Sequence, residues 1–131
     1  MRELLKAGAG IMESDNEGLT PLHYACADGH AEIAREMLAK GADKEAVTNS
    51  GCTPLSVACE HGHLAAAKLL IIEHGAAINH LDNGGRSALW RAKWRVTRDE
   101  AAHAAGAEFP TAAERAEHKK LVKFLEKRGA T

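Results

Sequence analysis

The stretch Thr20-Pro-Leu-His-Tyr-Ala25 decides the fold, because the chain repeats it at a nearly fixed interval. After 33 residues it reads Thr53-Pro-Leu-Ser-Val-Ala58, and after a further 34 it reads Ser87-Ala-Leu-Trp-Arg-Ala92. A glycine stands two residues before each copy, at Gly18, Gly51 and Gly85. Self-similarity at a period of about 20 to 50 residues is typical of stacked repeats, so the sequence predicts a repeat array.

Each copy carries signals that start and stop helices. The Thr-Pro pairs at 20–21 and 53–54 favour a helix start, because threonine accepts hydrogen bonds from free backbone N–H groups and proline fits the first helical position. Gly-His pairs at 29–30 and 62–63 follow at a common offset and separate this helix from a second one. We therefore expect two short helices in each repeat, with a glycine-containing turn between repeats.

Apolar residues recur at helical spacing within each repeat and define the predicted core. Hydrophobic residues make up 45% of the chain but aromatic residues only 4%, so small aliphatic side chains must fill this core. The predicted core residues are Leu22, Ala25, Cys26, Ile33, Ala34, Met37, Leu38, Leu55, Ala58, Cys59, Ala66, Ala67, Leu70, Ile71, Leu121, Val122 and Leu125.

The pattern closely resembles the ankyrin repeat, whose signature combines T-P-L-H-x-A with a period of about 33 residues. The resemblance implies an all-α repeat solenoid of helix-turn-helix units with β-turn or hairpin fingers. We predict one domain over residues 1–131, made of a partial repeat at 1–14 and repeats at 15–47, 48–81 and 82–131. In the family, the position of His23 often hydrogen-bonds between repeats, and Ser56 stands there in the second repeat.

The third repeat departs from the family pattern. Trp90 replaces the histidine, and alignment of His118 with the earlier Gly-His pairs leaves residues 96–116 as an insertion between the two helices. The insertion contains eight alanines and two capping-box patterns, separated by a glycine and a proline between 106 and 110. Helical extensions with a bend at 106–110 are one interpretation, and disorder is the other. Extended helices would cover Trp90 or Trp94.

Charge is distributed unevenly along the chain, although the formal net charge is −1. Residues 1–85 carry 6 Lys or Arg against 12 Asp or Glu, whereas residues 86–131 carry 11 against 6. Two solvated faces of opposite sign would explain this, and so would a basic third repeat that meets an acidic partner. The basic residues at 91–98 alternate with tryptophan, a pattern that suits nucleic acid or a phosphorylated target.

No group of residues has the spacing of a catalytic or metal centre. The histidines either occupy repeat positions or lie far from any cysteine pair, whereas zinc sites gather four ligands at characteristic spacings. Gly8-Ala-Gly10 lacks the further glycine and the preceding strand of a phosphate-binding loop. We therefore predict no enzymatic activity, no cofactor and no metal site.

Cysteine usage and hydropathy indicate the compartment. Three cysteines, an odd number, argue against a disulfide framework. Cys26 and Cys59 occupy the same repeat position, about 8–10 Å apart and beyond disulfide reach, so we interpret them as buried and Cys52 as the accessible cysteine. The sequence shows neither a signal peptide nor a run of about 20 apolar residues. We predict an intracellular protein of the cytoplasm, with the nucleus as the alternative.

The resemblance implies a non-catalytic module that binds another protein. Stacked repeats offer a rigid concave surface that loses little entropy on binding. In the family, contacts come from the hairpin tips and from exposed positions of the first helices. Carried onto this sequence, these positions are Asn16, Glu17, Leu19, Ala27, Asp28, Asn49, Ser50, Cys52, Glu60, His61, Asn83, Arg86, Trp94 and Arg95.

Two alternative functions remain at this level. One is recognition of nucleic acid or acidic lipid by the basic third repeat, and the other is a role as a regulatory fragment of a larger multidomain protein. The partial repeat also suggests which surfaces could associate with this chain. Its Leu4 and Leu5 would lack an upstream cover, so we expect this face to self-associate or to stack on further repeats.

Overall fold

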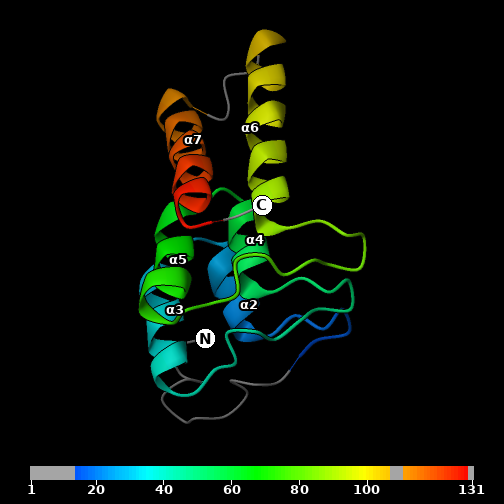
Figure 1. The fold of residues 1–131 in the computed structure, drawn as a ribbon, viewed down its shortest axis with the longest axis vertical. Helices are drawn as coiled ribbons and strands as arrows, with labels where there is room; N and C mark the ends of the chain where they lie inside the picture. The colour runs from blue at the N-terminus through cyan, green and yellow to red at the C-terminus, as the bar shows by residue number, and fades with distance from the viewer. Residues whose placement is uncertain (1–13, 107–110, 130–131) are drawn as a thin grey trace.

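The computed structural model describes residues 14–106 and 111–129, which form two layers of helices stacked repeat upon repeat (Figure 1). The first helix of each repeat is α2 (Pro21–Ala27), α4 (Pro54–Glu60) or α6 (Ala88–Ala104), and these three pack side by side. The second layer contains α3 (Ala31–Ala39), α5 (Leu64–Lys68) with its π-helical continuation η1 (Leu69–Glu73), and α7 (Ala112–Lys127). This arrangement confirms the predicted all-helical repeat fold. The predicted partial repeat, with its expected self-association, lies almost wholly outside the described residues.

Each repeat begins with the same tight turn, which projects as a finger to one side of the helices (Figure 1). In the second finger, the Thr48 N–H donates to the Cys52 carbonyl at 3.0 Å and the Gly51 N–H donates to the Thr48 carbonyl at 2.8 Å. Gly51 has a φ of +84°, and a Cβ there would lie 2.9 Å from the backbone nitrogen of Asn83 in the next finger. Glycine is therefore required both by the turn and by the close approach of neighbouring fingers.

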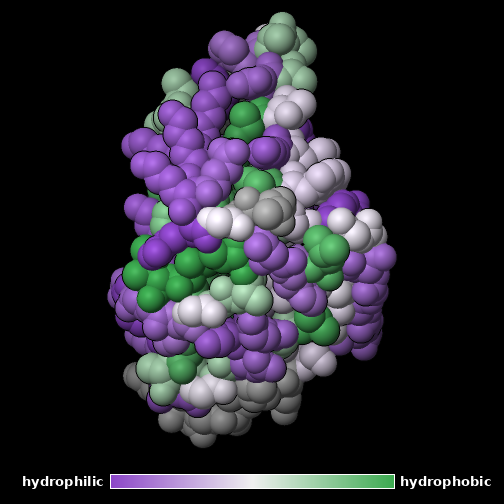
Figure 2. Space-filling view, in the orientation of Figure 1, coloured by the Kyte–Doolittle hydropathy of each residue, from purple (hydrophilic) through white to green (hydrophobic). Residues whose placement is uncertain are grey.

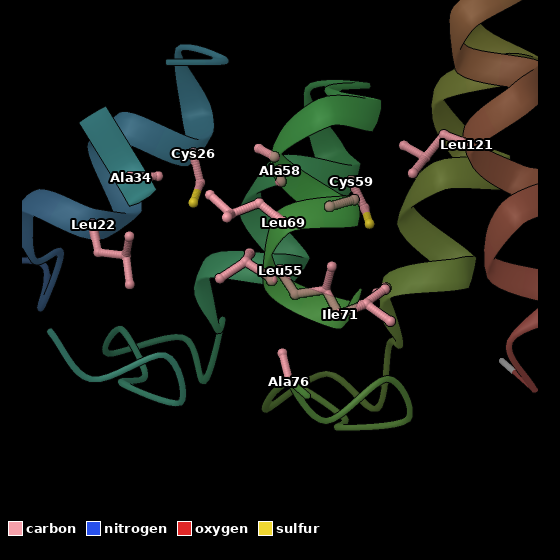
Figure 3. Packing of buried hydrophobic residues seen from close by; sticks show 14 of the residues in the cluster. Leu22, Cys26, Ala34, Leu55, Ala58, Cys59, Leu69, Ile71, Ala76 and Leu121 are labelled. Carbon is pink, nitrogen blue, oxygen red and sulfur yellow. The ribbon is translucent and has the colours of Figure 1, made fainter. Parts of the chain in front are cut away.

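The apolar faces of the two layers meet in one continuous core (Figure 3). All predicted core residues are buried, except Ile33 and Val122, which are partly buried and pack against the others. Cys59 points toward the side of the stack where α7 carries Leu121, so the core passes from one repeat to the next (Figure 3).

The second repeat contains one more residue than the first in its second helix. The chain from Leu69 to Glu73 accommodates this residue by adopting the wider π-helical turn. A π-turn absorbs one extra residue without moving the helix ends. Leu70 and Ile71 therefore keep the buried positions that the repeat pattern predicts for them.

The third repeat is enlarged by two long helices that rise beyond the stack (Figure 1). Helix α6 has 17 residues, whereas α2 and α4 have 7 each. Helix α7 begins at Ala112, six residues before His118, which aligns with the N-cap histidines of the other second helices. The bend expected at 106–110 falls mainly on residues 107–110, which lie outside the described residues. Helix thus occupies most of the segment at 96–116, as the helical interpretation expected.

The prediction that Trp90 or Trp94 packs beneath this hairpin is wrong. The two side chains are 45% and 42% exposed, because they lie on a different face of α6 from the buried Ala92 and Asp99. Asp99 instead makes a buried hydrogen bond with Nδ1 of His118 in α7.

Candidate partner-binding groove

A groove with a volume of about 600 Å³ runs between the fingers and the first helices of the first two repeats. The fingers form one wall, and α2 and α4 form the other. The lining residues are Glu17, Leu19, Tyr24, Ala27, Asp28, Thr48, Asn49, Ser50, Cys52, Val57, Glu60 and His61.

A ladder of asparagines fixes the fingers that border this groove. Asn16, Asn49 and Asn83 occupy the same position in successive fingers. The Asn49 side-chain amide donates to the Asn16 carbonyl at 2.9 Å, and the Asn83 amide donates to the Asn49 carbonyl at 2.9 Å. A partner would therefore meet a wall that is already ordered, which lowers the entropy lost on binding.

Tyr24 joins the first helix to the first finger. Its hydroxyl donates to a carboxylate oxygen of Asp15, whose other oxygen accepts from the backbone N–H groups of Glu17 and Leu19 at 2.9 and 3.0 Å. The hydrogen bond from Tyr24 lowers the pKa of Asp15, and the same bond raises the pKa of Tyr24. The Tyr24 ring is thus held over the groove by an ionised carboxylate.

The third repeat uses the same two positions in a different way. Arg91 stands where the first repeat has Tyr24, and Asp82 stands where it has Asp15. Arg91 is only 7% exposed, and its guanidinium pairs with Asp82 and, at 3.2 Å, with Glu60 of α4. Burial alone would raise the pKa of Asp82, but the hydrogen bonds from Arg86 N–H and the Arg91 side chain lower it to about 2.

This buried pair corrects two expectations from the sequence. Arg91 is not part of a basic surface, because its charge is neutralised between the second and third repeats. Cys52 is not an exposed contact residue: it is 8% exposed, and its sulfur accepts from Arg91 Nη2 at 3.1 Å.

Two histidines, the buried His23 and the half-buried His63, connect successive repeats beside the groove. The backbone N–H of Thr20 donates to His23 Nδ1 at 3.0 Å, so the proton resides on Nε2, which donates to the Cys52 carbonyl at 3.0 Å. This is the inter-repeat bond expected from the family. Ser56, at the same position in the second repeat, reaches only Thr53, at 3.1 Å. His63 Nε2 donates to the Ala27 carbonyl at 2.9 Å, and burial lowers the pKa of both His23 and His63.

The charged side chains that line the groove are mainly acidic. Glu17 and Asp28 are exposed and Glu60 is half-exposed, whereas His61 is the basic side chain in the lining. The aromatic face of Tyr24 lies among them, 42% exposed. Carboxylates around an accessible aromatic ring form a surface that attracts lysine and arginine side chains.

The structure gathers nine of the fourteen predicted contact residues around this groove: Glu17, Leu19, Ala27, Asp28, Asn49, Ser50, Cys52, Glu60 and His61. Asn16, Asn83, Arg86, Trp94 and Arg95 lie outside its lining. Sequence reasoning missed Tyr24, Thr48 and Val57. Tyr24 could have been found, because it precedes Ala27 and Asp28 by three and four residues and so shares their helix face.

The described residues contain neither a group of side chains that could hold a metal ion nor a helix that could cross a membrane. Across residues 14–106 and 111–129, no three His, Cys, Asp or Glu side chains gather closely enough to hold a metal ion. None of the helices in these ranges combines the length and the apolar character needed to cross a bilayer.

The stacked helix pairs and their finger turns define a repeat protein of the ankyrin class, and comparison with family models agrees. The model for ankyrin repeats, in three copies, matches residues 1–82 and, in an overlapping match, residues 41–103. The chain therefore belongs to the ankyrin-repeat family, whose members generally mediate protein–protein interaction.

More specific similarity is confined to about one repeat's length. The chain is 56% identical over 32 residues to protein phosphatase 1 regulatory subunit 27 of Homo sapiens and, equally, to the protein of the same name from Mus musculus. The match covers 24% of this chain and 21% of each relative, so the chain spans about a fifth of the length of the relatives it matches.

Proposed function

We propose that this chain is a non-catalytic interaction module whose groove binds an extended, basic segment of a partner protein. The observation that carries the proposal is the acidic lining formed by Glu17, Asp28 and Glu60 on a scaffold that is ordered in advance. The acidic lining would attract a basic segment at long range, and the ordered walls would fix the position of that segment once it is bound.

The position of Tyr24 suggests how the segment would be held. Its ring is accessible, and Asp15 anchors its hydroxyl at the far end. A lysine or arginine laid across the ring would face Glu17 and Asp28 at the groove's edges, combining cation–π attraction with charge pairing. Val57 would contact the aliphatic part of the same segment.

The similarity to a phosphatase regulatory subunit is compatible with a binding role but does not identify the partner. The 32 matched residues correspond to about one repeat, and one repeat specifies a structural unit rather than a binding surface. The three cysteines are unpaired and buried, which supports the proposed intracellular location.

The alternative of nucleic-acid or acidic-lipid binding through residues 91–98 receives less support. Arg91 is committed to Asp82 and Glu60 in the interior. Arg86 and Arg98 each lie over a tryptophan ring, at 5.4 Å from Trp90 and Trp94 respectively, so one face of each ring is already covered by a cation.

Fluorescence anisotropy with two labelled peptides tests the proposal, one rich in lysine and arginine and the other its glutamate counterpart. We expect the basic peptide to bind with an affinity that depends on the carboxylates of the groove, whereas any binding of the acidic peptide should not depend on them. The double variant Glu17→Gln, Asp28→Asn removes two exposed carboxylates of the lining and should weaken binding by about tenfold or more. Glu114→Gln with Glu117→Gln removes the same charge from the exposed surface of α7 and should change the affinity little. Equal weakening by both double variants would refute a groove site.

A further inference from the structure

A second hollow, on the layer of second helices, has the opposite charge. It lies between α5 and α7, has a volume of about 300 Å³, and is lined by Leu64, Lys68, Lys120, Lys123, Phe124 and Lys127. We propose that this lysine cradle, defined by those six residues, is a separate docking site for an acidic segment of a partner protein.

The cradle's charge is uncompensated, unlike that of the neighbouring lysines. In an adjoining hollow between α6 and α7, which Lys123 also borders, Lys93 pairs with Glu126 at 3.7 Å and Lys119 pairs with Glu100 at 3.3 Å. In contrast, the four cradle lysines form no ion pair with any residue in the described ranges, and no carboxylate lines the hollow.

Helical geometry concentrates these charges. Lys120, Lys123 and Lys127 follow one another at three and four residues and therefore share one face of α7. Lys68 faces them from the end of α5. Four like charges around one hollow repel one another, and a bound row of carboxylates would relieve this repulsion.

The floor of the cradle is apolar. Leu64 and Phe124 are both half-buried and pack against the core. In the space-filling view, hydrophilic residues cover the surface over α7, and hydrophobic residues emerge below them over α5 (Figure 2). This combination fits a short peptide that places one apolar side chain on the floor and acidic side chains against the surrounding lysines.

Two cations lie over the ring of Phe124, and this favours a protein segment, rather than a membrane or a nucleic acid, as the ligand of the lysine cradle. Lys68 Nζ and the Arg128 guanidinium both lie 5.8 Å from the centre of its ring. A ring held by two cations is not available for insertion into a bilayer or for stacking on a base. A concave hollow also meets a flat bilayer poorly, whereas it can enclose a side chain.

The probe for a test is a labelled, glutamate-rich peptide with one central leucine, titrated against the full chain at low and moderate salt. We expect binding that weakens with salt. Lys123→Glu should reduce the affinity by about tenfold or more, whereas Lys40→Glu, the same reversal on the exposed end of the first repeat, should change it less than about twofold. Circular dichroism of both variants checks that the fold is intact.

Three further outcomes would overturn the proposal. One is binding to phosphatidylserine vesicles or single-stranded oligonucleotide that depends on Lys123 while the acidic peptide fails to bind. Another is equal weakening by Lys40→Glu and Lys123→Glu, which would indicate a nonspecific charge effect. The third is association of the chain with itself in sedimentation that Lys123→Glu abolishes, because the cradle would then bind a second copy. The groove proposal survives each of these, since its variants lie in the first two repeats, away from the cradle.

Discussion

Lys93 and Glu126 form an ion pair, 3.7 Å long, across the outer face of the third repeat. The repeat alignment places them where the second repeat has Cys59 and Ile71, both buried against the third repeat. A further repeat stacked on this face would have to bury both charges, at a cost of several kcal/mol per ion before pairing. The pair therefore gives the third repeat a polar outer face, which disfavours stacking of a further apolar repeat surface upon it.

We expect the double variant Lys93→Cys, Glu126→Ile, which restores the residues of the second repeat, to expose an apolar stacking face and to associate. Sedimentation velocity should show a species larger than the monomer, under reducing conditions that exclude a disulfide. The control Glu100→Cys, Lys119→Ile removes another ion pair between the same helices, away from the stacking position, and should stay monomeric. A monomeric Lys93→Cys, Glu126→Ile chain would show that the ion pair does not prevent stacking.

Arg91 and Tyr24 occupy the same repeat position, but their replacement should have very different effects. Arg91→Ala removes the buried partner of the Asp82 carboxylate, leaving Arg86 Nε at 3.4 Å, and should lower the free energy of unfolding by up to about 3–5 kcal/mol. Tyr24→Phe removes one hydrogen bond at the exposed surface and should lower the free energy of unfolding much less. Urea unfolding measures both values. In addition, the pKa of Asp82, about 2 in the native chain, should rise in Arg91→Ala, and equal effects of the two variants would contradict this account.

Acidification should destabilise the chain through His23 and His63. Burial lowers the pKa of each, so the unfolded state binds their protons more readily than the folded state. Their contribution is fully present above about pH 6.5 and is lost as the pH falls below that value. His23→Gln should lower the stability at neutral pH by about 1–3 kcal/mol and reduce the further loss in urea midpoint on acidification. The control variant His103→Gln, at the exposed end of α6, should lose as much urea midpoint on acidification as the native chain. If His23→Gln also loses as much as the native chain, His23 is not the cause of the acid destabilisation.

The close approach of Gly62 to the next repeat leads to a prediction about steric strain. Gly62 has a φ of +75°, and a Cβ there would lie 2.1 Å from Cδ2 of His118 in the next repeat. Gly75 has a similar φ of +62°, but a Cβ would meet nothing within 4 Å. Gly75→Ala therefore measures backbone strain alone, and Gly62→Ala should cost about 1–3 kcal/mol more in urea unfolding. If the two costs are the same, the histidine ring moves aside freely.

Much of this architecture was predictable because it depends on local, repeated signals. The Thr-Pro starts, the helix stops and the apolar stripes identified both layers and the core. Most of the groove also followed from repeat positions, since equivalent residues in stacked units line one surface. Tyr24 could have been added from its spacing on α2.

Other features depended on contacts between residues that are distant in sequence. No local pattern shows that Arg91 turns inward, because its burial depends on Asp82 and on Glu60 of the previous repeat. Large aromatic side chains such as the two tryptophans are often buried, which favoured a core position for them. In the structure, however, the face of α6 that meets α7 carries Asp99 and contacts His118. The lysine cradle likewise needs α5 and α7 to be adjacent before Lys68 meets the lysines of α7.

The last prediction concerns how the extended hairpin is held. Asp99 comes from the segment that interrupts the repeat pattern, whereas His118 occupies a position of the pattern itself, and the two form a buried pair between α6 and α7. Asp99→Ala would leave the Nδ1 of His118 without this partner and should lower the free energy of unfolding by about 1–3 kcal/mol. For a domain of this size, that corresponds to a fall in melting temperature of roughly 3–10 °C.

The neighbouring Glu100→Ala supplies the control, because Glu100 pairs with Lys119 across the same two helices but at the exposed surface. A surface pair contributes less than about 1 kcal/mol, so this variant should melt close to the native chain. Amide hydrogen exchange should distinguish the two variants further. Asp99→Ala should accelerate exchange in the end of α6 beyond Asp99 more than in α2 or α4. Equal melting temperatures for the two variants would mean that the hairpin's apolar contacts, such as those of Leu121, hold it without the buried pair.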